Sequence, residues 1–133
     1  MKKYILLLVT LSFSVLLTSC FEGYTSDEGD PLKKYLEPEK LKELTLNPDP
    51  SIWIIDVRSE GSYEKGHIPT AKSYSSSVIM DKLNEIPKDQ YLILYCETGG
   101  RAQMVIKKLE KQGYTKMMNW GGIKRWPYKA VQE

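Results

Sequence analysis

Nearly continuous apolar runs alternate with amphipathic segments along the second half of the chain. The runs Ile52–Val57 and Tyr91–Tyr95 are rich in β-branched and large apolar residues, which is typical of strands buried on both faces of a parallel sheet. The segment Arg101–Gln112 places its apolar side chains on one helical face and its lysines on the other, and Gly113 follows where a C-cap is expected. This pattern predicts at least two buried strands followed by one well-defined helix.

Strands that alternate with helices predict an α/β fold, here a single domain with a central parallel β-sheet and helices on both faces. In such sheets ligands bind beyond the carboxyl ends of the strands, so the residues that follow each strand are candidates for a site. The weaker signals predict a helix over Pro38–Leu46, a short helix or turn over Ser59–Lys65, a short helix over Asp81–Ile86, a strand over Tyr114–Asn119, a turn over Trp120–Gly122 and a final short helix over Ile123–Trp126.

The first nineteen residues form a segment of another kind. Lys2 and Lys3 precede a nearly unbroken apolar run, Tyr4–Leu17, which has the length of a signal-peptide core and is short for a membrane span. The residues Leu17-Thr18-Ser19-Cys20 resemble the lipobox of bacterial lipoproteins. That resemblance implies cleavage before Cys20, acylation of Cys20, and export to a membrane surface facing the periplasm or the cell exterior. An uncleaved anchor and an ordinary secreted protein are the alternatives.

The residues that follow predict a flexible tether over 20–31 and a folded domain over 32–133. Phe21–Pro31 is acidic, contains glycine and offers little to bury. Without Lys2 and Lys3 the formal net charge falls from +2 to zero, so nothing in the charge predicts a nucleic-acid partner. The membrane, reached through the lipid anchor, is the macromolecular surface that the sequence predicts for this domain.

The chain has two cysteines, Cys20 and Cys96. If Cys20 is lipidated, Cys96 is the only thiol and no internal disulfide can form, which is unusual for an exported domain. Such a thiol is either buried and inert or retained for chemistry. One histidine and one cysteine are too few to predict a zinc site, and no metal is expected.

The stretch from Cys96 to Arg101 is the strongest candidate for chemistry. Cys96 ends a strand, Arg101 opens a helix, and Gly99 and Gly100 between them permit the positive φ of a tight backbone cradle. Backbone N–H groups at a helix N-terminus favour a thiolate or a persulfide anion, and Arg101 would add a fixed positive charge. A plain strand-to-helix turn with a buried cysteine is the alternative. Glu97, beside the thiolate in sequence, would oppose its charge if it pointed inward.

Four pieces of sequence together resemble the rhodanese family, in that family's order over about residues 35–127. Ile55–Arg58 and Tyr63–Ala71 look like its first signature, Leu94–Arg101 like its active-site loop, and Trp120–Ile123 with Trp126 like its C-terminal signature. Cysteine-based phosphatases place five residues between cysteine and arginine, whereas four stand here, which favours an anion cradle for a single sulfur atom over one for a phosphoryl group.

The resemblance implies a single-domain sulfurtransferase without a cofactor. Cys96 then carries sulfur as a persulfide between a small anionic donor such as thiosulfate and an acceptor such as cyanide or a thiol. The loop lacks the Gly-Val-Thr or Gly-Val-Ser ending of mercaptopyruvate-type relatives, which favours thiosulfate. The substrate-binding residues implied by the loop are Glu97, Thr98, Gly99, Gly100 and Arg101.

Three other polar residues are expected to support the site and not to react. Asp56 and Arg58 follow a strand and are interpreted first as scaffold, paired with each other or with the loop. His67 lies in a turn signature, where hydrogen bonds that hold loops together are more common than proton transfer. A membrane-tethered module that binds a sulfur species or a partner protein without turnover is the alternative function, and the presence of Cys96 favours the enzyme.

Overall fold

The computed structural model describes residues 22–133, so the predicted export signal and Cys20 lie outside the described residues. Four parallel strands form one sheet in the order β2-β1-β3-β4. Their bounds are Ile52–Asp56 for β1, Lys72–Ser73 for β2, Tyr91–Cys96 for β3 and Met117–Gly122 for β4. The prediction of an α/β fold with a central parallel sheet is therefore confirmed.

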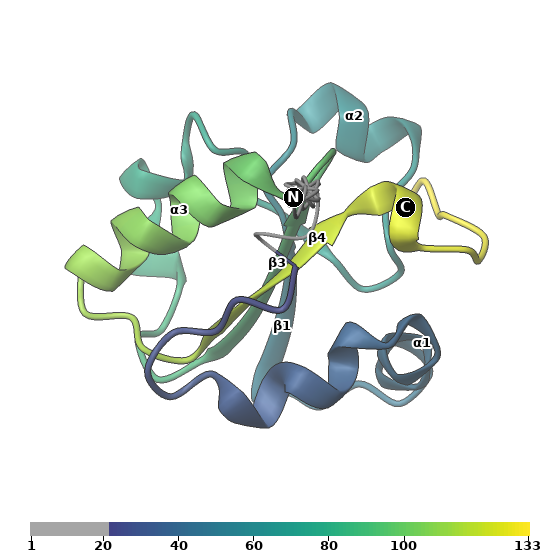
Figure 1. Ribbon diagram of the computed structural model, residues 1–133. Coiled ribbons are helices and arrows are strands. Elements are labelled where there is room, and N and C mark those ends of the chain that lie inside the picture. The colour runs from purple at the N-terminus through teal and green to yellow at the C-terminus, as the bar shows by residue number, and fades with distance from the viewer. Residues whose placement is uncertain (1–21) are drawn as a thin grey trace, which may run out of the picture.

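The strands bury alternate residues in two separate cores, one on each face of the sheet. Helix α3 (Gly100–Lys111) covers the face to which Ile55, Leu94 and Cys96 point. Helix α1 (Pro38–Leu46) and the 3₁₀ helix η2 (Asp30–Leu36) cover the other face, where Ile54, Ile93 and Tyr95 point. Figure 1 shows α3 and α1 on opposite sides of the sheet. The alternation follows from the pleat, which sends neighbouring residues of a strand to opposite faces.

Helix ends agree with the local sequence signals. Helix α2 (Glu60–Lys65) begins after Ser59, whose hydroxyl accepts a hydrogen bond from the Ser62 N–H, and it ends at Gly66. Beyond α3, Gly113 has a φ of 91°, and the Tyr114 N–H donates to the carbonyl of Leu109. The predicted helices over 38–46 and 101–112 are confirmed to within one residue at each end.

Two of the predicted elements differ from the structure. In place of a helix over 81–86, the chain makes two 3₁₀ turns, η3 (Ile79–Asp81) and η4 (Leu83–Glu85), because its backbone bonds there reach back three residues. The predicted turn over Trp120–Gly122 is wrong, since these residues continue β4 beside β3. The final helix is the 3₁₀ helix η5 (Ile123–Arg125).

The prediction of a flexible tether fails for the described residues before Leu32. Residues 22–29, called here the N-terminal edge segment, run antiparallel beside β4, with Thr25 paired to Met118. The Gly23 N–H donates to the carbonyl of Asn119 at 2.8 Å, and the Ser26 N–H donates to that of Met117 at 3.0 Å. An acidic, glycine-bearing segment is thus held by backbone bonds that satisfy the outer edge of β4, a requirement that composition does not reveal.

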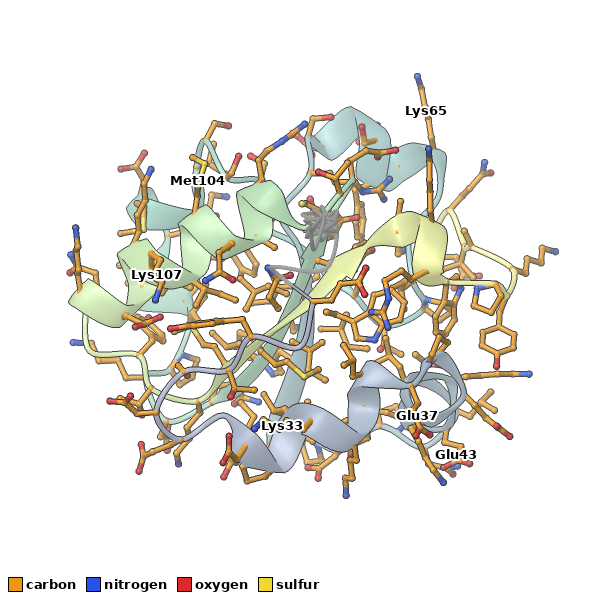
Figure 2. The ribbon with its side chains drawn as sticks, viewed as in Figure 1. Lys33, Glu37, Glu43, Lys65, Met104 and Lys107 are labelled. Carbon is orange, nitrogen blue, oxygen red and sulfur yellow. The ribbon has the colours of Figure 1, made fainter. Side chains whose placement is uncertain are left out.

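The outer surface is largely charged. Figure 2 shows Lys33, on η2, and Lys107, on α3, on opposite sides of the sheet. Each forms an ion pair with an acidic residue three positions away, Asp30 and Glu110 respectively. None of the helices within residues 22–133 combines the length and the apolar character that crossing a bilayer requires.

Candidate active site

Cys96 is the last residue of β3, and its side chain lies on the face of the sheet that α3 covers. Only 1% of its surface is exposed. The N–H of Gly99 points back at the sulfur, with its nitrogen 3.0 Å from the Cys96 Sγ. A backbone donor therefore already faces the atom on which the negative charge of a thiolate or a persulfide would reside.

The loop reaches α3 through a left-handed turn at Gly99. This residue has φ 97° and ψ −19°, a backbone conformation that is strained for residues with a side chain. It forms the N-cap of α3. Gly100 does not share the positive φ expected for it, because it is already the first residue of the helix. The twelve-residue helix directs its positive dipole end toward the loop that begins at Cys96.

Strand β4 supports the loop from beneath. Cys96 lies opposite Gly122 in the ladder, and a Cβ built on Gly122 would stand 2.4 Å from the carbonyl oxygen of Glu97. Only glycine allows β4 to approach the loop this closely. Gly122, which was interpreted as part of a turn signal, is thus a packing requirement of the loop.

Asn119, which sequence reasoning did not single out, also holds the loop. Its side chain is fully buried, and Nδ2 donates to the carbonyl of Gly99 at 2.9 Å. A polar residue at the predicted end of a strand is normally expected to face solvent. The sequence therefore carried no signal that Asn119 holds the loop. The side chain instead turns inward to Gly99 and Gln103 at the start of α3.

Asp56 and Arg58 form a buried ion pair behind the loop, with Arg58 Nη2 2.7 Å from Asp56 Oδ2. Burial opposes the charged guanidinium, but the hydrogen bonds and charge of Asp56 outweigh it and hold the pKa of Arg58 above its usual value. Arg58 also donates to the carbonyl of Gly66 at 2.8 Å, which ties β1 to the end of α2. This geometry agrees with the interpretation of both residues as scaffold.

Tyr95 completes this cluster from the strand that carries Cys96. Its hydroxyl donates to Asp56 Oδ2 at 2.9 Å and accepts from the Ile68 N–H at 3.1 Å. Burial, and then the nearby charge of Asp56, raise the pKa of Tyr95 far above its usual range. The phenol therefore stays protonated and fixes β3 against β1 and the loop after α2.

The charged side chains of the loop lie at its surface. The Glu97 carboxylate is half exposed and lies 3.8 Å from Arg58 Nη1, which offsets part of its charge. Arg101 is exposed, and its side chain takes part in no hydrogen bond or ion pair among residues 22–133. Arg101 is therefore available to an incoming anion at the rim of the site.

His67 is buried by packing against α2. Its ring stacks on Tyr63 with centroids 3.6 Å apart, and Nδ1 lies 2.8 Å from the carbonyl oxygen of Tyr63. Its backbone pairs with Val131 near the C-terminus. These contacts describe a residue that joins α2 to the C-terminal segment, and no hydrogen bond connects it to Cys96 within the described chain.

In this domain a cysteine ends a strand of a parallel four-stranded sheet, and a helix begins directly after it. A comparison with protein families agrees with this arrangement. The model of the rhodanese-like domain matches residues 37–128. The chain belongs to this family. The fold and the loop described above are thus those of a rhodanese-like domain, as the sequence motifs predicted.

Similar proteins include named sulfurtransferases. A sulfurtransferase of Allochromatium vinosum is 33% identical over 92 residues, which cover 68% of this chain and 85% of that protein. A thiosulfate sulfurtransferase of Coxiella burnetii is 29% identical over 93 residues, covering 69% of this chain and 87% of that protein. The crystal structure of a rhodanese-like domain protein from Staphylococcus aureus superposes with a TM-score of 0.63 at 29% identity, over 72% of this chain and 94% of that one. The family and these relatives support sulfur transfer as the general activity.

Proposed function

We propose that this rhodanese-like domain transfers sulfane sulfur through a persulfide on Cys96. The observation that carries the proposal is the Gly99 N–H directed at the Cys96 Sγ, 3.0 Å away, at the N-terminus of α3. A donor fixed in this position stabilises negative charge on the sulfur before any substrate arrives, which is the preorganisation that favours a reactive thiolate. The same end of the helix then stabilises the terminal sulfur of a persulfide.

Two displacement steps balance the reaction. The Cys96 thiolate attacks the outer sulfur of thiosulfate, the S–S bond of thiosulfate breaks, and sulfite leaves with the electron pair. The terminal sulfur of the Cys96 persulfide is then attacked by cyanide or by a thiolate, which restores the Cys96 thiolate and releases thiocyanate or an acceptor persulfide. Both steps exchange one sulfur between nucleophiles, so neither a metal nor a redox cofactor takes part.

Thiosulfate is the donor that we propose. The loop Glu97-Thr98-Gly99-Gly100-Arg101 lacks the ending of mercaptopyruvate-type loops, and the relative from Coxiella burnetii carries the name thiosulfate sulfurtransferase. The exposed Arg101 suits a small doubly charged anion arriving from solvent. The test is steady-state formation of thiocyanate from thiosulfate and cyanide. A protein that binds thiosulfate but forms no thiocyanate would instead support the tethered binding module.

We also propose that the mature protein is exported and anchored through a lipidated Cys20. In that case the anchor lies close to the active-site edge of the sheet. Glu22 forms an ion pair with Arg125 at 3.4 Å and packs on Gly121, the neighbour of the glycine that faces Cys96. Cys20 is two residues before Glu22, a reach of about 7 Å at most. The carboxyl ends of the strands would then face the bilayer.

This orientation can be tested with two matched probes in the full-length, lipidated protein. The exposed Lys124 follows β4 at the carboxyl edge, whereas the exposed Lys88 precedes β3 at the opposite edge. Each is replaced by cysteine in a Cys96→Ser background and labelled. Energy transfer to a dye on the lipid headgroups should be stronger from position 124. Equal or reversed transfer would contradict the orientation without touching the proposed sulfur chemistry.

A further inference from the structure

Asn119 joins three parts of the molecule at a point directly behind the active-site loop. It lies in β4 opposite Leu94 of β3, and its backbone N–H and carbonyl pair with Tyr24 and Gly23 of the N-terminal edge segment, both at 2.8 Å. The edge segment on one side and β3 on the other therefore flank its backbone, and its side chain is fully buried. Such a residue places its side-chain amide with little freedom.

The orientation of the amide is determined by its partners. Its Oδ1 accepts from the N–H of Gly121 at 2.9 Å, a donor that only the oxygen can satisfy. The Nδ2 group consequently faces two acceptors, the carbonyl oxygen of Gly99 at 2.9 Å and Gln103 Oε1 at 3.1 Å. A flipped amide would set Nδ2 against the N–H of Gly121 and Oδ1 against both acceptors, so one arrangement is favoured strongly.

Gly99 is the residue through which this amide reaches the sulfur. Its carbonyl is held by Asn119 and by the N–H of Gln103 at 3.0 Å, while its own N–H donates to the Cys96 Sγ. Glycine in the left-handed region has no side chain to limit its backbone torsions, so contacts on its carbonyl help to fix the torsions that orient its N–H. Removing the Asn119 bond releases one of the two contacts that hold this residue.

We propose that Asn119 is a positioning residue for Cys96: through Gly99 it holds the N–H that stabilises the thiolate and the persulfide. The predicted effect of Asn119 on sulfur transfer rests on the proposed sulfur chemistry. The predicted effect of Asn119 on the reactivity of the Cys96 thiol does not depend on any sulfur donor or acceptor. The positioning role and the proposed sulfur transfer can therefore fail separately.

The test is the rate of alkylation of Cys96 by iodoacetamide as a function of pH, followed in the full-length protein by mass spectrometry that separates the Cys96 peptide from the Cys20 peptide. Asn119→Ala should slow alkylation about tenfold at neutral pH, since the backbone donor that favours negative charge on the sulfur is no longer held in place. The deficit should shrink at alkaline pH, because free thiols lose their proton there without help from a backbone donor. Thiocyanate formation at neutral pH should fall by a similar factor.

Two control variants separate positioning from stability. Gln103→Ala removes the other acceptor of Nδ2 and leaves the bond to Gly99, so its alkylation profile should match the wild type. Tyr114→Phe removes the buried hydroxyl that donates to the carbonyl of Ile86 at 2.6 Å, away from the loop. It should lower the melting temperature without changing the profile of Cys96.

A second substitution keeps the test decisive if Asn119→Ala does not fold. Asn119→Asp preserves the shape of the side chain but, when ionised, faces the Gly99 carbonyl with an acceptor, and it should slow alkylation at neutral pH at least tenfold. Folded Asn119→Ala or Asn119→Asp with a wild-type alkylation profile would overturn the proposal and leave Asn119 a purely structural residue. The two proposals can also be told apart. If Asn119→Ala slows alkylation as predicted but the wild type forms no thiocyanate, the positioning role stands and the proposed sulfur transfer is contradicted.

Discussion

Gly122 and Glu97 approach each other so closely that β4 and the active-site loop share one packing surface. A Cβ on Gly122 would lie 2.4 Å from the carbonyl oxygen of Glu97 and 3.1 Å from the Cα of Thr98, and both contacts are with backbone, which cannot rotate away. The position of the loop therefore depends on the absence of a side chain in the neighbouring strand.

Gly122→Ala should destabilise the domain by about 1–3 kcal/mol, because one methyl group must push the loop or the strand aside. It should also lower thiocyanate formation, since the loop that moves carries Cys96. Chemical denaturation and steady-state rates check both effects. Gly61→Ala is the matched control: a Cβ there meets nothing within 4 Å, and the residue lies in α2, so a gain of roughly 0.5–1 kcal/mol and an unchanged rate are expected.

Tyr95→Phe should cost about 1–3 kcal/mol, because the N–H of Ile68 loses its acceptor and Asp56 loses a donor in a buried site. The loss should depend on pH. Burial and Asp56 raise the pKa of Tyr95 in the folded state above its unfolded value, so its contribution is complete below about pH 10 and declines as the pH rises further. Urea denaturation between neutral and alkaline pH should therefore show a steeper decline for the wild type than for Tyr95→Phe. Parallel declines would contradict this account of the cluster.

Arg101→Ala should reduce the catalytic efficiency with thiosulfate by about ten- to a hundredfold, which corresponds to one charged hydrogen bond of roughly 1.5–3 kcal/mol. The side chain is exposed, so the melting temperature should hardly change. Lys108→Ala removes an equal charge from an exposed position on α3 and serves as the control for long-range electrostatics. Equal effects of the two substitutions would show that Arg101 acts only through net charge.

The parts of the fold predicted well from sequence are those in which a local pattern and the tertiary environment agree. The continuous apolar runs of β1 and β3 are mostly buried, and the apolar face of α3 is buried. Cys96 is the last residue of β3. Helix α3 begins at Gly100, one residue before the predicted start. The spacing from Cys96 to Arg101 is therefore enough to locate the candidate loop from the sequence.

The parts that were missed depend on contacts between segments distant in sequence. The edge segment is ordered by backbone bonds to β4, which a polar composition does not announce. Trp120 is the extra residue where β4 shifts register against β3, and it packs in the core, although the Trp-Gly-Gly sequence suggested a turn. Asn119 was overlooked for the same reason, because its role depends on side-chain contacts with Gly99 and Gln103, which are distant in sequence.

The anchor proposal gives a prediction for the whole cell. Expressed in a bacterial host, the full-length protein should fractionate with membranes and incorporate labelled fatty acid, and Cys20→Ala should lose the label. If Cys20→Ala still yielded a mature chain that starts at residue 20, an ordinary signal peptidase would explain the processing. The protein would then be an exported sulfurtransferase without a lipid.

The central claim is tested most directly by the mass of the purified protein after incubation with thiosulfate. Cys96 should gain one sulfur atom, cyanide should remove it with the release of thiocyanate, and Cys96→Ser should show neither change. A Cys96→Ser protein that forms thiocyanate at the wild-type rate, or a wild-type protein whose Cys96 gains no sulfur, would contradict the account.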